Sequence, residues 1–447
     1  MMRRLLPTRR VSGTIKVPGD KSIAHRAAIL SLLSESPITV RNFPDGADCR
    51  RSLDAVEKCG VQVKQRHDEL VLNPPEELSV EPDTIIDCGN SGTTARLMAG
   101  LIAGSELSVI LSGDESLSAR PMKRIVDPLT EMGGRLYDTD GHLPLKVNGT
   151  RLLPFEYVMP VASAQVKSAL ILAGLASGCS VKVREKTLTR DHTEIMLQEL
   201  GQGISVKKVT PVLVDDVHDP RKKRLKMPED FRSEIRVGAG SRVKGGLVDI
   251  PGDISTAAFF FAAAALLGGS VTVENVGLNR TRTAFLEYLK NVGCDVAVTN
   301  RQTITGEPRG TVTVTGGDLK ARRISGATTV ELIDEIPVVA VLASKTRGTT
   351  LIRNAAELKV KESDRLRAIS ENLTAMSVKC GLLEDGLAIE GREELQGADL
   401  SSFGDHRIAM AFSVAALAAS GPSSLDDDSS VAVSCPGFYD LLSAVVG

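Results

Sequence analysis

The sequence predicts an α/β protein with two similar lobes, each built from three copies of one β-α-β-α-β-β unit. Two observations support this fold class. The chain has 447 residues, which is too long for a single hydrophobic core. One pattern also recurs six times: an Ala-rich apolar stretch, a Gly turn, a strand of β-branched residues, and a more amphipathic stretch that closes on Gly. The six copies begin at Val17, Asp87, Met159, Ile250, Ile333 and Phe403.

Within each unit, the Ala-rich stretch predicts a helix that must be buried, and the amphipathic stretch predicts one that can face solvent. Packing the units by threes around the buried helices gives the two lobes. We expect one lobe to contain residues 1–16 and 247–447, and the other to contain residues 17–246. The chain is expected to cross between them near residues 14–18 and 240–248.

The composition is that of an ordinary soluble globular protein, with 42% hydrophobic residues, 25% charged residues and a net charge of -2. Such a charge does not favour nucleic-acid binding, so any anion site must be local. The charged segment Asp215–Arg242, with its run Arg221–Arg224, lengthens the third copy and is predicted to be a surface excursion. The longest apolar run, 257–267, is much shorter than the roughly 20 residues of a membrane-spanning helix. We expect neither a membrane span nor a signal peptide.

The cysteines are odd in number and scattered, and none forms a Cys-x-x-Cys pair. This pattern favours reduced thiols in the cytoplasm, without a disulfide framework or a zinc motif. The seven cysteines are Cys49, Cys59, Cys88, Cys179, Cys294, Cys380 and Cys435.

Polar and charged residues gather at the starts of the Ala-rich helices. In the first copy, Lys21 and Arg26 stand beside free helix-start amides, which together suit a dianion. In the second copy, a Gly-rich turn contains Gly92 and leads to Arg96, and its amides can approach an anion closely. It is not a Walker loop, because the Gly-Lys-Ser/Thr ending is missing. Arg120 follows, just before a helix that starts with Pro.

The third copy and the second half add hydroxyl, amide and acidic groups. Ser163 and Gln165 suit a phosphate or sugar-like hydroxyls, and Arg190 lies in the next turn. Asp334 and Glu335 stand at the mouth of an apolar helix. Two interpretations of this acidic pair are open, a simple acidic helix cap or a pair that takes part in chemistry.

The stretch 359–367 has seven polar residues among nine, followed by a helical apolar pattern. It is either a solvated helix start or a site in which Lys361 and Glu362 move protons and hold an anion. In the last copy, His406 is either a ligand or a hydrogen-bonded structural residue, and Arg407 follows it. The fourth copy has a polar helix start without a cation, so we assign Asp253 to structure.

So many cations at helix starts cannot all be buried unless an anionic ligand compensates them. We therefore predict that the protein binds small substrates with several phosphates or carboxylates between its lobes. The sequence has no nucleotide loop, metal motif or nucleophilic Cys signature. The residues alone therefore predict transfer chemistry on small anions and no more specific reaction. The cations are Lys21, Arg26, Arg96, Arg120, Arg190, Lys361, Arg365 and Arg407.

Several motifs together resemble the 5-enolpyruvylshikimate-3-phosphate (EPSP) synthase family over essentially the whole chain. They are PGDKSIAHR, GNSGTTAR, SARP, SAQVKSAL, TRDHTE, IDEIP, KVKESDR and GDHR. The resemblance implies a two-lobed inside-out α/β barrel of six units. It implies a cytoplasmic transferase of the shikimate pathway that moves the enolpyruvyl group of phosphoenolpyruvate to the 5-hydroxyl of shikimate 3-phosphate. The family needs no cofactor or metal, and we expect a monomer.

The resemblance also implies roles for individual residues. Asp334, helped by Lys361, and Glu362 fall on the acid–base positions. Shikimate 3-phosphate is expected at Lys21, Ser22, Arg26, Ser163, Ala164, Gln165, Arg190, Asp334 and Lys361. Phosphoenolpyruvate is expected at Lys21, Gly92, Arg120, Gln165, Arg365 and Arg407, with Lys361 as a further contact.

This chain departs from the family at one position, because Ser434–Gly437 contains no Lys where many members have a phosphate contact. Gly92, where glyphosate-tolerant relatives carry a larger residue, predicts ordinary glyphosate sensitivity. Two alternatives remain. The sister enzyme that acts on UDP-N-acetylglucosamine has the same fold, but it usually has a reactive Cys where this chain has Glu115. A non-catalytic binding protein would need the cations but not the proton-transfer set.

Overall fold

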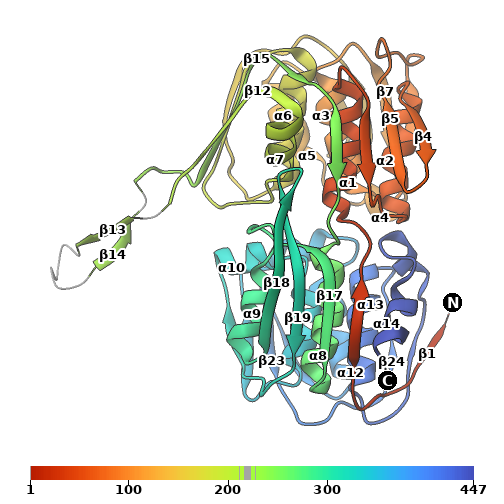
Figure 1. Cartoon of the computed structure of the whole chain (residues 1–447), viewed down its shortest axis with the longest axis vertical. Helices are drawn as coiled ribbons and strands as arrows, with labels where there is room; N and C mark the ends of the chain where they lie inside the picture. The colour runs from red at the N-terminus through yellow and green to blue at the C-terminus, as the bar shows by residue number, and fades with distance from the viewer. Residues whose placement is uncertain (1, 211, 216–222, 227, 447) are drawn as a thin grey trace.

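The computed structural model describes the backbone of residues 2–210, 212–215, 223–226 and 228–446. These residues form two lobes that are stacked along the long axis of the molecule (Figure 1). Each lobe has its own cluster of buried apolar side chains. One cluster contains residues from 23 to 250, and the other joins residues 5–17 to residues 254–445.

Six small sheets share one arrangement, in which two parallel strands are followed by antiparallel ones. The strands of the first lobe are β3 (Ile38–Arg41), β4 (Gln62–Arg66), β5 (Glu69–Asn73), β6 (Thr84–Asp87), β7 (Ser108–Ser112), β8 (Arg135–Thr139), β9 (His142–Asn148), β10 (Phe155–Val158), β11 (Val181–Glu185), β12 (Gly201–Lys208), β13 (Val212–Asp215), β14 (Lys223–Lys226), β15 (Ser233–Val243) and β16 (Gly246–Asp249). Those of the second lobe are β1 (Arg3–Leu5), β2 (Ser12–Lys16), β17 (Ser270–Gly277), β18 (Asp295–Ile304), β19 (Glu307–Thr315), β20 (Arg323–Ile324), β21 (Thr349–Ile352), β22 (Lys379–Leu383), β23 (Gly386–Glu390), β24 (Asp399–Leu400) and β25 (Ser423–Leu425). The sheet orders are β16-β3-β5-β4, β6-β7-β9-β8, β10-β11-β15-β12, β18-β19-β17-β2, β20-β21-β23-β22 and β1-β25-β24. The predicted fold class of repeated α/β units in two lobes is confirmed.

The helices follow the same repeat. In the first lobe they are α1 (Lys21–Leu30), η1 (Ser31–Leu33), α2 (Ala47–Lys58), α3 (Gly92–Ala103), α4 (Glu115–Ser118), α5 (Lys123–Glu131), α6 (Ala164–Ser177) and α7 (His192–Leu200). In the second lobe they are α8 (Ile254–Leu267), α9 (Ala284–Val292), α10 (Ala327–Glu331), α11 (Ile336–Ala343), η2 (Ala356–Val360), α12 (Arg365–Ala375), α13 (His406–Leu417), η3 (Ser429–Val433) and α14 (Phe438–Val445). The Ala-rich helices α1, α3, α6, α8, α11 and α13 are the buried ones, as their sequence pattern predicts.

The two crossings of the chain exchange strands between the lobes. Strand β2 precedes the first lobe in sequence, yet it pairs in parallel with β17 of the second lobe. Strand β16 follows the other first-lobe strands in sequence and pairs in parallel with β3, with Gly246 opposite Ile38. Residues 246–249 therefore lie in a first-lobe sheet. The lobe boundaries expected from the sequence, 1–16 with 247–447 and 17–246, stay a prediction.

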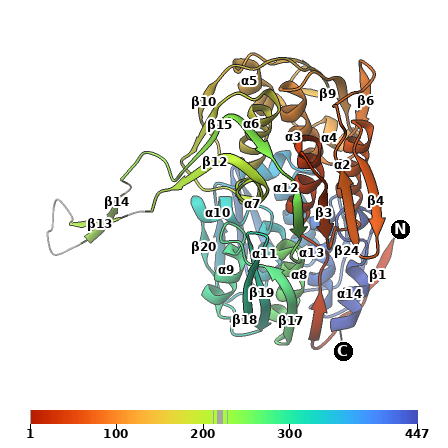
Figure 2. The ribbon, with the colours of Figure 1, turned by 45° about the horizontal axis from the view of Figure 1, so that its top comes forward.

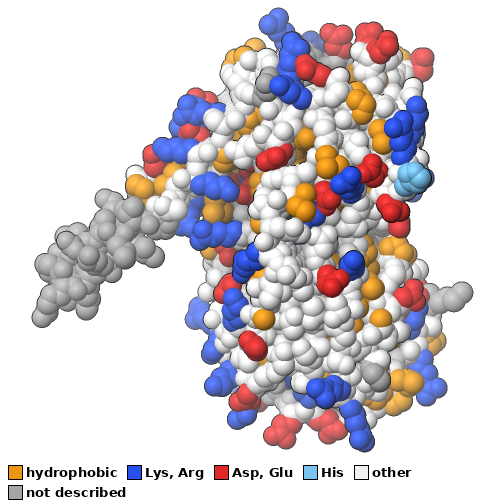
Figure 3. Space-filling view, viewed as in Figure 1, with side chains coloured by type: hydrophobic (Ala, Val, Ile, Leu, Met, Phe, Trp, Pro, Cys, Tyr) orange, Lys and Arg blue, Asp and Glu red, His pale blue; other side chains and the backbone are white. Residues whose placement is uncertain are grey.

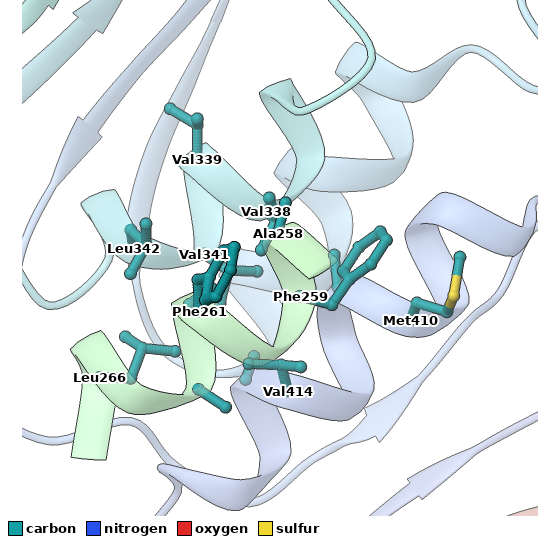
Figure 4. Close-up of a cluster of buried hydrophobic side chains, with 14 of the residues drawn as sticks. Ala258, Phe259, Phe261, Leu266, Val338, Val339, Val341, Leu342, Met410 and Val414 are labelled. Atoms are coloured by element: carbon teal, nitrogen blue, oxygen red, sulfur yellow. The ribbon is translucent and has the colours of Figure 1, made fainter. Parts of the chain in front are cut away.

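Small residues let the buried helices approach one another closely. A Cβ atom on Gly100 of α3 would lie 2.3 Å from the carbonyl oxygen of Ala169 on α6, and one on Gly104 would lie 2.3 Å from that of Ala173. Because these glycines are four residues apart, they share one face of α3. In the second lobe, α8, α11 and α13 pack through Phe, Val and Leu side chains instead (Figure 4).

The prediction that Asp215–Arg242 forms a surface excursion is wrong for part of this segment. Residues 233–243 form β15, which pairs with both β11 and β12 and buries Ile235 and Val237. The charges misled the prediction because Glu234 is buried between two arginines of the sheet. Strands β13 and β14 form a hairpin that stands away from the lobe (Figures 1 and 2). Of the basic run, Arg221 and Lys222 lie outside the described residues.

The surface has no single-sign charge patch on the face shown in Figure 3, where Lys and Arg side chains are interspersed with Asp and Glu. In the described part of the chain, no helix has the length and apolar character needed to cross a membrane.

Candidate active site

A cavity of about 300 Å³ lies between the two lobes and is lined by residues from both. The starts of the buried helices surround it, so most of the predicted site residues meet there although they are far apart in sequence. Twelve of these residues line it: Lys21, Ser22, Gly92, Arg120, Ser163, Ala164, Gln165, Arg190, Asp334, Lys361, Glu362 and Arg407. Helix geometry explains the convergence, because each buried helix presents its N-terminal amides and first-turn side chains to the same space.

Two predicted ligand-binding arginines, Arg26 and Arg365, lie behind the cavity wall. The guanidinium of Arg26 donates to Thr193 Oγ1 (2.7 Å), the Ser22 carbonyl oxygen (2.8 Å) and Ser168 Oγ (3.0 Å). Burial lowers the pKa of Arg26 to about 10. Arg365 is 1% exposed, and its guanidinium donates to Asp405. In this structure both arginines hold the wall together.

The first-lobe wall is rich in cations and helix-start donors. Asp20 caps α1 by accepting from the amides of Ser22 and Ile23, which leaves the Lys21 side chain free to face the cavity. Nζ of Lys21 donates to Oδ2 of Asp48 at 2.9 Å. Oε1 of Gln165 accepts from Nη1 of Arg96 at 2.9 Å.

The second-lobe wall contains Asp334, in the turn before α11. Burial raises the pKa of its carboxyl group, but four surrounding cations more than offset burial and hold the pKa well below its usual range. Asp334 is therefore ionised at neutral pH, and its charge balances several cations at once. The four cations are Arg190, Arg407, Lys361 and Arg365.

Glu362 lies between η2 and α12, next to two arginines. Its Oε2 accepts from Nη2 of Arg365 at 2.7 Å, and its Oε1 lies 3.4 Å from Nη1 of Arg120. Burial raises its pKa, but Arg365, Arg120, His406 and Lys361 together lower it well below the usual value. Without a ligand, this carboxyl group is also ionised.

Several contacts cross the cavity from one lobe to the other. Nη2 of Arg190 donates to Oδ2 of Asp334, and Arg120 reaches Glu362. The hydroxyl of Ser116 donates to the Glu362 carbonyl oxygen at 3.0 Å. These contacts join the lobes across the cavity, and the first two use charged groups that a substrate can compete for.

The arginines on the first-lobe side have donors that the protein leaves unused. Nε of Arg96, Arg120 and Arg124 is buried and has no hydrogen-bond partner in the described part of the chain. Burial, followed by the charges of Arg124 and Arg120, lowers the pKa of Arg96 to about 9. A cluster of like charges with free donors is suited to an anionic ligand.

Among the described residues, His25, Asp48 and Cys49 are the one group with donor atoms close enough for a metal ion, all within 4.8 Å. Lys21 already supplies a cation to Asp48. Burial raises the pKa of the Cys49 thiol well above its usual range, which disfavours the thiolate that a metal binds. Nδ1 of His25 shares a hydrogen bond of 2.8 Å with Ser52 Oγ. The group fits a buried polar network better than a metal centre.

Sequence reasoning missed some residues that line the cavity. Arg124 lies in the first turn of α5, close behind Arg120 and Pro121, and the helix start expected there could have indicated it. Glu357 precedes Lys361 by four residues in a short 3-10 turn, which carries no strong pattern. Asp253, which was assigned to structure, lines the cavity and also lies 3.3 Å from Nη2 of Arg282.

Comparison with known proteins gives a consistent result. The family model described as EPSP synthase (3-phosphoshikimate 1-carboxyvinyltransferase) matches residues 5–233 and 228–442. The chain is 44% identical to a 3-phosphoshikimate 1-carboxyvinyltransferase of Anaeromyxobacter sp. (strain K), over 100% of this chain and 96% of the relative. It is 39% identical to the one of Brevibacillus brevis, over 99% of both.

A solved structure of EPSP synthase from Acinetobacter baumannii superposes with a TM-score of 0.81 and 34% identity, covering 100% of this chain and 98% of that one. The solved structure therefore has the same two-lobed fold as this chain. From these matches and the full-length coverage, the chain belongs to the EPSP synthase (3-phosphoshikimate 1-carboxyvinyltransferase) family.

Proposed function

We propose that this chain transfers the enolpyruvyl group of phosphoenolpyruvate to the 5-hydroxyl of shikimate 3-phosphate and releases phosphate. One observation carries this proposal most directly: two ionised carboxylates and a lysine, Asp334, Glu362 and Lys361, face an inter-lobe cavity whose wall is rich in cations. A protein that only binds anions needs the cations but not a proton-transfer set.

The first lobe, proposed as residues 17–246, holds most of the shikimate 3-phosphate site. Ser163 and Gln165 at the start of α6 offer hydroxyl and amide groups, and the amides of that helix start suit the phosphate. Arg190 and Lys21 add positive charge to the same cavity. Arg26 serves this half indirectly, because it holds the backbone of Ser22 and the side chain of Thr193.

Phosphoenolpyruvate is proposed to lie at the side of the cavity formed by Gly92, Arg120 and Arg407, beside the unused guanidinium donors of Arg96 and Arg120. Arg365 stabilises this side from behind through Glu362. The residues 1–16 and 247–447 are the proposed second lobe, which brings the acid–base groups to both substrates.

The proposed reaction is an addition followed by an elimination. The 5-hydroxyl oxygen bonds to C2 of phosphoenolpyruvate while C3 gains a proton and becomes a methyl group. The bond from C2 to the phosphate oxygen then breaks, phosphate leaves, and the methyl group loses a proton to restore the double bond. We assign the removal of the hydroxyl proton to Asp334, helped by Lys361, and the protonation of C3 to Glu362.

A carboxyl group that protonates C3 must itself be protonated, but Glu362 is ionised in the free enzyme. The assignment therefore requires that substrate binding raises the pKa of Glu362. The bound anion supplies that change, because its negative charge cancels the effect of Arg120 and Arg365 on the carboxyl group. The pKa of Glu362 must then rise, and the carboxyl group takes up the proton that it later gives to carbon.

Phosphate release from phosphoenolpyruvate tests the proposed function. We expect the purified protein to release phosphate with shikimate 3-phosphate as acceptor, without added metal, and not with UDP-N-acetylglucosamine. Release with the UDP sugar would show that the sister enzyme is the correct assignment, although Glu115 lies where that enzyme usually has Cys. Release with neither acceptor would favour the binding-protein alternative.

Adding a methyl group at Gly92 is expected to weaken phosphoenolpyruvate binding. A Cβ there would lie 2.7 Å from Nη1 of Arg96 and 3.4 Å from Nη1 of Arg120, so the end of the Arg96 side chain must shift, whereas Arg120 is in ordinary contact. For Gly92→Ala we expect KM for phosphoenolpyruvate to rise about tenfold, because a small displacement at a reacting centre is costly. The wild-type enzyme should be inhibited by glyphosate at concentrations near its KM for phosphoenolpyruvate.

Steady-state kinetics with each substrate varied in turn checks this result. Gly421→Ala is the matched control, because a Cβ at residue 421 meets nothing within 4 Å. Equal KM values for the two variants would contradict the placement of phosphoenolpyruvate at Gly92.

We also propose a cytoplasmic monomer. The cysteines in the described part of the chain are free, and six of the seven are buried, which suits a reducing compartment. Residues from both lobes of one chain complete the cavity, so catalysis does not require a second copy.

A further inference from the structure

The ion pair between Arg124 and Glu357 joins the two lobes at the cavity. Arg124 lies on α5 of the first lobe, and Glu357 lies in η2 of the second. Nη1 of Arg124 donates to Oε1 of Glu357 at 3.2 Å, and both residues line the cavity. Neither residue has a place in the reaction proposed above.

Glu357 also contacts a group that does have such a place. The same oxygen, Oε1, lies 3.6 Å from Nζ of Lys361, one turn further along the chain. Nζ of Lys361 lies 3.9 Å from Oδ1 of Asp334 on its other side. The ammonium group of Lys361 is thus held between two carboxylates, and one of them is tied to the opposite lobe.

Local structure leaves Lys361 dependent on these contacts. The 3-10 turn ends at Val360, and Lys361 itself has extended backbone (φ -84°, ψ -150°), so no helix fixes its side chain. Burial raises the pKa of Glu357, but Lys361 and Arg124 together lower it below the usual value. Glu357 therefore stays ionised and keeps both cations.

Two other charged contacts between the lobes at this cavity use proposed substrate groups, and a third, between Arg282 and Asp20, lies close in sequence to the first chain crossing. Arg190 pairs with Asp334, and Arg120 pairs with Glu362, so bound substrates compete for both pairs. The pair of Arg124 with Glu357 uses no group that is proposed to bind a substrate, so it can persist while both substrates are bound. It is suited to hold the lobes together during the reaction.

We propose that Glu357 is a positioning residue that places the ammonium group of Lys361 and, through Arg124, makes that placement depend on closure of the lobes. The proposal rests on the function proposed above. It separates two roles: Arg124 acts on closure alone, whereas Glu357 acts on closure and on Lys361.

These roles predict different kinetics. Arg124→Met leaves Glu357 beside Lys361 and should raise KM for both substrates about fivefold with kcat within twofold, because only closure is weakened. Glu357→Gln should in addition lower kcat at least about tenfold, because the ammonium group is no longer held in place. Arg124→Lys should restore most of the lost affinity.

A double-mutant cycle provides the test that a merely structural role would not satisfy. In the Lys361→Met background, Glu357→Gln should lower kcat no further, since the group on which it acts is gone. Full additivity of the two changes, or an unchanged kcat in Glu357→Gln, would overturn the proposal.

Two controls separate this result from other failures. Lys123→Met removes an exposed ion pair with Asp127 on the same helix and should leave both kinetic constants unchanged. Wild-type phosphate release is measured in parallel. If the wild type is inactive, the proposed function fails; if the wild type is active and Glu357→Gln matches Lys123→Met, only the positioning role fails.

Discussion

Glu362→Gln is expected to lower turnover by about 10²–10⁴-fold, the usual contribution of a general acid or base, with little change in KM for shikimate 3-phosphate. An amide cannot give a proton to C3 of phosphoenolpyruvate, although it keeps the shape of the side chain. The effect should therefore appear in kcat. Rapid-quench measurement of a single turnover shows whether the chemical step itself is slowed.

The structure indicates that this variant remains folded. Nε of Arg365 still donates to Oδ2 of Asp405 at 2.7 Å, so the buried guanidinium keeps a carboxylate partner. Glu371→Gln is the matched control, because Glu371 pairs with Arg367 on the exposed side of the same helix, α12. Near-normal turnover in Glu362→Gln would remove this residue as the acid.

Proton uptake provides an independent measure of the same assignment. Because a bound anion raises the pKa of Glu362, the wild type should take up protons when both substrates bind, and a pH indicator in weak buffer detects them. Glu362→Gln should take up fewer. Equal uptake by the two proteins would place the proton on another group.

The repeat in the sequence was sufficient to predict the architecture, because burial of an Ala-rich helix and the Gly turn after it are local properties. Residues 1–16, which contain β2, were expected in the second lobe, but the pairing of β16 with β3 was not visible, since it joins strands more than 200 residues apart. Strand β15 was missed for a related reason. Its charged residue Glu234 is buried only because Arg184 and Arg236 lie beside it in the folded sheet.

The candidate site, too, could be predicted from the sequence only in part. Helix starts could be located from Gly and polar residues, so the cations of the cavity wall were found. Whether a given arginine faces the cavity or the core depends on tertiary partners, and the sequence offered no way to separate Arg26 and Arg365 from Arg120. Glu357 was missed because its importance comes from contacts with Arg124 and Lys361 in the folded chain.

Lys167 is a buried charge that does not line the cavity. It lies on α6 and is 0% exposed, and its Nζ is 2.9 Å from Oε2 of Glu185 and 2.6 Å from Oε1 of Glu194. Burial lowers the pKa of Lys167, but the two carboxylates more than offset burial and raise it. Glu185 in turn accepts from the amide and hydroxyl of Thr189, next to Arg190.

Lys167→Met should destabilise the protein by about 3–5 kcal/mol, because it leaves two carboxylates buried without a cation. For a lobe of this size, that loss lowers Tm by roughly 6–20 °C. Lys182→Met is the matched control: Lys182 lies on the adjacent strand β11, pairs with the exposed Glu156, and should change stability by less than about 1 kcal/mol. Thermal unfolding followed by circular dichroism measures both variants.

The pH dependence of this loss identifies its cause. Burial already raises the pKa of Glu194 above its usual value, and removal of the ammonium group must raise it further. A carboxyl group whose folded pKa exceeds its unfolded value destabilises the fold at high pH and ceases to do so as pH falls through the folded pKa towards the unfolded one. The deficit of Lys167→Met should therefore be full at neutral pH and shrink on acidification, and adding Glu194→Gln should recover part of it. A deficit that is constant with pH would instead indicate lost packing of the lysine side chain.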